Sequence, residues 1–129
     1  MTSRTTPPPA QDDLPTLVEP EWTSRDARLQ IRCSNHAGHW RLSLHGELDL
    51  SNVAMLEDEI RLAETTAETV TIDLRGLAFM DSSGLHAIQQ AQHPSRLDGR
   101  LRLLPGSRMV QSVFRLTGTE HALPFRPSP

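Results

Sequence analysis

The feature that most constrains the fold is a change in the spacing of apolar residues along the chain. At 29–33, and again at 40–44, they take every second position, the period of a strand with one buried face. From Val53 to Ala67 they recur three or four positions apart, the period of an amphipathic helix. The two periods continue to alternate as far as Thr117, which predicts an α/β domain.

The elements are expected in the order ββαβαβα. The turn signal Asn35-His36-Ala37-Gly38 joins the first two strands into an antiparallel hairpin, and Ser51 or Asp49 is expected to cap the first helix. Because a helix between strands implies a right-handed crossover, we expect a mixed β-sheet of about four to five strands with the helices mainly on one face. The expected strands lie at 29–33, 40–44, 70–74 and 100–104, and the helices begin near residues 53, 85 and 107.

The two ends of the chain differ in composition from the middle. Five of the ten prolines lie within residues 1–20, and three lie in the last six residues. Such stretches bury too little apolar surface to offset the entropy of ordering them. The sequence therefore predicts a flexible N-terminal tail at 1–24, one domain at 25–126 and a C-terminal tail at 127–129.

Net charge, cysteine content and the lack of long apolar runs indicate which partners and which cellular compartment to expect. The net charge of −3 supplies no basic field, which argues against nucleic acid as a partner. The single cysteine, Cys33, excludes an internal disulfide and suits a reducing cytosol. Neither a signal peptide nor an apolar run of the ~20 residues that span a membrane is present. We expect a cytoplasmic monomer without a membrane partner.

A pair of serines, Ser82 and Ser83, stands where a strand passes into a helix. The first N–H groups of a helix lack intrahelical partners, so a serine there is a good cap and a phosphorylated serine meets hydrogen-bond donors. Phosphorylation would add nearly two negative charges beside Asp81 and repel a partner fitted to the neutral serine, without unfolding the domain. Gly84 is expected to let another protein approach closely, and Asp49 is hypothesised to lie near the serines.

Four segments resemble the STAS domains of bacterial anti-sigma factor antagonists. They are Gly46-Glu47-Leu48-Asp49, Ile72-Asp73-Leu74, Phe79-Met80-Asp81-Ser82-Ser83-Gly84-Leu85 and Val113-Phe114-Arg115-Leu116-Thr117-Gly118. The segment at 79–85 is the most specific, and the resemblance covers nearly the whole expected domain. The sequence departs from the family pattern at His86, where many relatives carry a small residue, and around Pro94.

The resemblance implies a partner-switching cycle. In that family the unphosphorylated antagonist binds an anti-sigma factor, a serine kinase of the GHKL type, and so releases a sigma factor. Phosphorylation ends the binding, and a PPM-type phosphatase restores it. The acceptor position falls on Ser83, with Ser82 as second choice. The implied partner-binding residues are Asp49, Asp81, Ser82, Ser83, Gly84, Leu85 and His86.

Other readings of the same residues remain open. The domain is alternatively a phosphorylation-independent STAS scaffold in a signalling assembly or a transport system. A hydrolase with Ser82 as nucleophile is disfavoured, because Met80 replaces the first glycine of G-x-S-x-G. The histidines lack zinc-ligand spacing and no glycine-rich phosphate loop is present, so we expect no catalytic residue, metal or cofactor. Glu57-Asp58-Glu59 is expected to form a solvated helix face.

Overall fold

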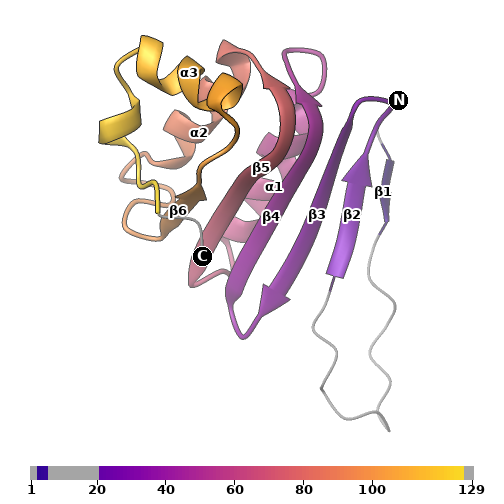
Figure 1. Ribbon diagram of the computed structural model, residues 1–129. Helices are drawn as coiled ribbons and strands as arrows, with labels where there is room; N and C mark the ends of the chain where they lie inside the picture. The colour runs from indigo at the N-terminus through magenta and orange to yellow at the C-terminus, as the bar shows by residue number, and fades with distance from the viewer. Residues whose placement is uncertain (1–2, 6–20, 127–129) are drawn as a thin grey trace, which may run out of the picture.

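The computed structural model describes residues 3–5 and 21–126, and these form one sheet with helices on one side (Figure 1). The sheet has six strands whose spatial order is the chain order. In chain order the elements are β1 Ser3–Thr5, β2 Glu21–Arg25, β3 Leu29–His36, β4 His39–Leu48, α1 Val53–Glu64, β5 Thr69–Met80, α2 Ser82–Ala91, β6 Leu101–Leu104, α3 Arg108–Leu116 and the 3-10 helix Glu120–Ala122.

The sheet is mixed, as the sequence predicts. Strands β1 to β4 pair antiparallel, whereas β4, β5 and β6 pair in parallel through the crossovers that contain α1 and α2. From β3 to α3 the order is ββαβαβα, so the predicted order is confirmed. The predicted hairpin is also confirmed, with Ala37 and Gly38 in the left-handed region at its turn.

The N-terminal boundary is a correction. Residues 3–5 and 21–24, expected to belong to a flexible tail, lie in strands β1 and β2; β1 pairs with β2, and β2 pairs with β3. Trp22 in β2 is buried, and its ring meets that of Trp40 edge-on with 5.0 Å between centroids. A five-residue strand holds too few apolar positions to reveal its period, which is why the sequence did not predict it. Residues 6–20 lie outside the described part of the chain.

One face of the sheet carries the core. The apolar side chains of β3, β4 and β5 that face the helices are fully or nearly fully buried, with Ile31, Leu42 and Ile72 at 0 % exposure. In Figure 1, α1 lies behind β4 and β5, and α2 and α3 lie next to β5 and β6. The alternate side chains, on the other face, are polar and have no helix over them in the described chain. This is the pattern of a sheet with one solvated face.

Helix α1 differs from expectation in its cap and in one acidic residue. Its N-cap is Asn52 rather than Ser51 or Asp49. Glu59, expected on a wet face, is 1 % exposed, and its two carboxylate oxygens share the single N–H of the Trp22 indole, at 3.0 Å to each oxygen. The helical period turns this carboxylate inward, where it meets Trp22 from β2 and the Cys33 thiol from β3, 3.6 Å from Oε2.

The last described residues run along β6. Leu103 donates its N–H to the carbonyl of Pro124 at 3.0 Å, and Arg126 donates to the carbonyl of Leu103 at 2.8 Å. Phe125 stacks edge-on against Phe114 of α3, so this segment also contributes to the core. None of the helices in the described part of the chain is long and apolar enough to cross a bilayer.

Candidate functional site

The candidate site lies where β5 ends and α2 begins. Strand β5 ends at Met80, and the Asp81 carboxylate accepts the N–H of Ser83 at 2.8 Å. The cap of α2 is therefore Asp81, not a serine, and Ser82 and Ser83 occupy the first two helical positions. The carboxylate suits this place, because it satisfies an orphan N–H and lies at the positive end of the helix dipole.

The two serine side chains differ in access. Ser82 is exposed and Ser83 is half-buried. Within residues 21–126, no hydrogen bond joins a histidine to either serine hydroxyl, so neither serine is paired there with the histidine base of a typical nucleophile. Both hydroxyls remain at the N-terminal turn of α2, where an added phosphate would meet N–H groups of the helix.

Gly84 and Leu85 do not lie on the surface. Both are buried, Leu85 at 3 % exposure. A Cβ on Gly84 would lie 2.7 Å from Cγ of Met80 and 2.8 Å from Cδ2 of Leu48. The glycine thus lets α2 pack against β4 and β5, which corrects the expectation that it leaves room for another protein. The helical turn carries His86 back to an exposed position.

The structure brings Asp49 to the same edge of the sheet as the serines. Leu48 at the end of β4 is the register partner of Met80, and the N–H of Asp81 donates to the Leu48 carbonyl at 3.2 Å. Asp49 and Asp81 therefore follow directly after neighbouring parallel strands. The hypothesised proximity of Asp49 to the serine segment rests on this pairing.

Asp49 is held by groups that the sequence did not single out. The hydroxyl and N–H of Ser51 donate to it at 2.6 and 2.9 Å, and Arg28 forms an ion pair with it at 2.6 Å. Chiefly the Ser51 hydroxyl, with help from Arg28 and against an opposing effect of burial, lowers the pKa of Asp49 below its usual 3.8. Asp49 is thus a fixed carboxylate. No sequence signal links it to Arg28, which lies on the loop before β3.

Two further features shape this edge. Asn52 is buried and bridges the loop, since its side chain accepts from the N–H of Asp49 and donates to the carbonyl of Glu47. Leu50 is 77 % exposed beside Asp49. The edge therefore presents two carboxylates, the serine pair and one exposed apolar side chain on a rigid frame, which suits contact with another protein.

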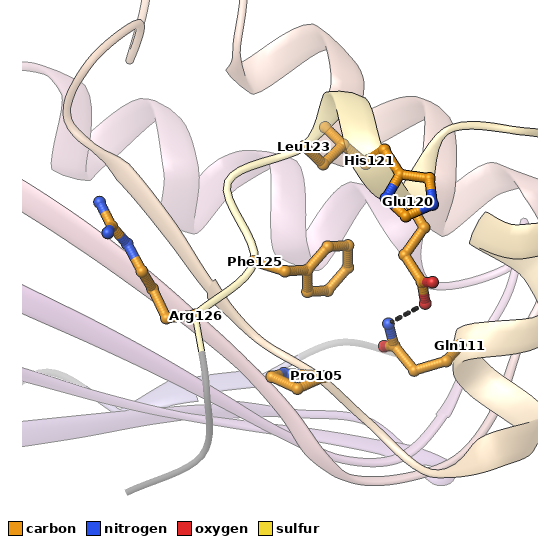
Figure 2. A pocket seen from close by; sticks show the side chains of 7 residues that line it. All are labelled: Pro105, Gln111, Glu120, His121, Leu123, Phe125 and Arg126. Carbon is orange, nitrogen blue, oxygen red and sulfur yellow. Dashed lines mark hydrogen bonds between the residues drawn. The ribbon is translucent and has the colours of Figure 1, made fainter.

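Two hollows on the described surface lie away from this site. The one drawn in Figure 2, with a volume of about 470 Å³, lies between the β6–α3 loop and the C-terminal segment. There Gln111 donates to the Glu120 carboxylate at 3.0 Å and accepts the N–H of Gly106, in the loop, at 2.9 Å. In the described residues no three side chains of His, Cys, Asp or Glu gather as metal ligands would.

Comparison with known proteins identifies the family. The STAS domain model matches residues 30–129. Among solved structures, an anti-sigma factor antagonist from Mycobacterium paratuberculosis has a TM-score of 0.70 at 21 % identity, covering 78 % of this chain and 86 % of that one. The antagonist SpoIIAA in its unphosphorylated form has a TM-score of 0.64 at 24 % identity, covering 77 % and 88 %. No curated protein sequence matches the chain.

The phosphorylated form of SpoIIAA, described as a Bacillus cell fate determinant, is also similar, with a TM-score of 0.55 at 23 % identity over 77 % of this chain and 91 % of that one. At these identities the structural matches show a shared fold. The family model spans most of the described domain, and its match agrees with the mixed sheet and helix order. The chain belongs to the STAS domain family.

Proposed function

We propose that this STAS protein is an anti-sigma factor antagonist controlled by phosphorylation of Ser83. The observation that carries the proposal is the position of the serine pair at the N-terminus of α2, next to the fixed Asp49 on an exposed edge of the sheet. Solved proteins of the same fold are described as anti-sigma factor antagonists, one of them in phosphorylated and unphosphorylated forms.

The proposed partner is an anti-sigma factor of the GHKL serine kinase type. It binds the unphosphorylated edge through Asp49, Asp81, Ser82, Ser83 and His86, with Leu50 as an added apolar contact. Gly84 and Leu85 are buried, so they do not contact the partner but position α2 against the sheet. The protein acts by binding and is not itself an enzyme.

Phosphorylation changes the edge more than the fold. A phosphate on Ser83 lies beside the Asp81 carboxylate, which already accepts the Ser83 N–H, and near Asp49. The binding surface then carries three anionic groups, whereas the unphosphorylated surface that the partner binds carries two. Repulsion between the added negative charge and the partner releases the partner. A PPM-type phosphatase reverses the change.

The test is capture from a lysate of the native host with wild-type, Ser83→Ala, Ser83→Asp and Ser82→Ala baits, followed by incubation of the recovered kinase with ATP. We expect a GHKL kinase with all baits except Ser83→Asp, and mass spectrometry should place the phosphate on Ser83. Circular dichroism should show every bait folded.

The competing outcomes are distinct. If Ser83→Asp retains the same partner as wild type, the switch is absent and the phosphorylation-independent scaffold holds instead. If the phosphate maps to Ser82 and only Ser82→Ala prevents it, the acceptor assignment is wrong while the antagonist role stands.

A further inference from the structure

The face of the sheet opposite the helices carries more positive charge than a solvated sheet requires. The part of this face in question runs from Glu21 to Arg25 in β2 and continues through their register partners in β3, β4, β5 and β6. Its charged side chains are five arginines and two carboxylates. The chain as a whole carries −3. Basic charge is thus concentrated on one face of an acidic protein. This arginine face consists of Arg25, Arg32, Arg41, Arg75 and Arg102 with Glu21 and Asp73.

The carboxylates neutralise only part of this face. Asp73 is 7 % exposed and is shared by two arginines: Arg75 donates to it at 3.0 and 2.8 Å, and Arg41 at 3.2 Å. Arg41 and Arg75 are still 43 % and 44 % exposed, so donors of both groups remain accessible. An arginine has five N–H donors, and one carboxylate cannot satisfy two such groups.

Three of the arginines form a diagonal line across adjacent strands. Arg25 is opposite Gln30, two residues from Arg32, and Arg32 is opposite Ser43, two residues from Arg41. Diagonal neighbours of this kind lie roughly 7–8 Å apart. Side chains on one side of an extended peptide recur about every 7 Å, so an extended segment laid along the line places alternate residues at successive arginines.

A hollow surrounds the middle arginine of the line. It has a volume of about 450 Å³ and lies between β2, β3 and β4. Arg32 shares its lining with Thr23, Ser34 and Ser43, which lie on the same face by register, and with the carboxylate of Glu21, the register partner of Ser34. The guanidinium and the three hydroxyls are donors that suit a carboxylate, whereas the Glu21 carboxylate in the same lining opposes one, so the line of arginines and not the hollow carries the charge argument.

We propose that the arginine face binds an acidic segment of a partner protein in extended conformation, with carboxylates at alternate positions along the line of arginines. The site lies on the open face of the sheet, whereas the serine pair lies at the end of β5, so this contact is separate from the phosphorylated edge. It gives the protein a second, constitutive docking surface for an acidic partner.

The test uses a fluorescein-labelled peptide of alternating glutamate and threonine and a matched peptide of glutamine and threonine, titrated by anisotropy into the full chain. We expect the acidic peptide alone to bind, and Arg32→Gln to weaken it roughly threefold to tenfold. Arg108→Gln, which removes an exposed arginine from α3, should leave the affinity unchanged. Amide chemical-shift changes should fall on β2 to β4.

Four results would overturn the proposal. These are no binding by the wild-type chain, equal weakening by Arg32→Gln and Arg108→Gln, tighter binding of oligothymidylate than of the acidic peptide, and self-association by sedimentation that Arg32→Gln abolishes. The third result would assign the face to nucleic acid, and the fourth to a second copy of the chain. Ser83→Asp should not alter peptide binding, which separates this test from that of the proposed function.

Discussion

At the residue scale, the cap of α2 is a single carboxylate. Asp81→Ala removes the acceptor of the Ser83 N–H and should lower the free energy of unfolding by about 1 kcal/mol, whereas Asp81→Asn retains a good cap and should lie close to wild type. Urea denaturation measures both. Ser82→Ala is the control at the adjacent exposed position, and if it proves as costly as Asp81→Ala, the cap is misassigned.

A second residue-scale prediction concerns acid stability. Burial raises the pKa of Asp73, but hydrogen bonds from Arg75 and Arg41 outweigh it and lower the pKa from 3.8 to about 2. Because the folded value is depressed, Asp73 stabilises the fold above pH 3.8, and this contribution is lost as the pH falls toward 2. The melting temperature of wild type should therefore exceed that of Asp73→Asn at neutral pH and converge with it near pH 2. If the difference in melting temperature between the two proteins stays constant with pH, the pKa of Asp73 is not lowered in the folded state.

At the scale of elements, the contact of α2 with the sheet depends on Gly84. A methyl group there meets Met80 and Leu48 at 2.7–2.8 Å. Overpacking of this kind costs about 1–3 kcal/mol, offset by up to about 1 kcal/mol of helix propensity. Gly84→Ala should therefore destabilise the domain in urea denaturation. Gln90→Ala, at an exposed position of the same helix, is the control and should not destabilise the domain. If Gly84→Ala instead stabilises the domain, α2 can shift to accommodate the methyl group.

Strand β2 is attached to α1 through a buried polar contact, and the two tryptophans provide a matched test of it. The Trp22 indole N–H donates to Glu59, whereas that of Trp40 is buried and has no hydrogen-bond partner in the described chain. Trp22→Phe should cost about 1–3 kcal/mol more than Trp40→Phe, because both lose the same ring volume and only one loses the bond. Chemical denaturation of the two variants gives the difference, and equal losses would mean that the contact adds no stability.

At the scale of the molecule, the family model begins at residue 30, but the sheet begins earlier. Deleting residues 1–25 removes β1 and β2 and uncovers Trp40 and Cys33. We expect the melting temperature to fall by roughly 10 °C, since the loss of the Trp22 side chain alone removes about 2–3 kcal/mol. Trp22→Ala in the full chain is the comparison; an unchanged melting temperature of the deletion would show that the domain does not need β2.

Sequence periodicity determined the core of this protein. The elements from β3 to α3 were predictable because each has several apolar residues at a fixed spacing, and burial of one face enforces that spacing. The strand-to-helix junction at the serine pair was predictable for the same reason, since its position depends only on the elements on either side.

Only the tertiary structure decided which side chains meet across the chain. Asp49 and Arg28, Trp22 and Glu59, and the diagonal of arginines are separated by up to 37 residues, and local spacing carries no information about such pairs. The burial of Gly84 and Glu59 also follows from neighbours that pack against them, not from their own segments. Local pattern therefore fixed the order of the elements, and packing between distant elements fixed the surfaces that a partner can reach.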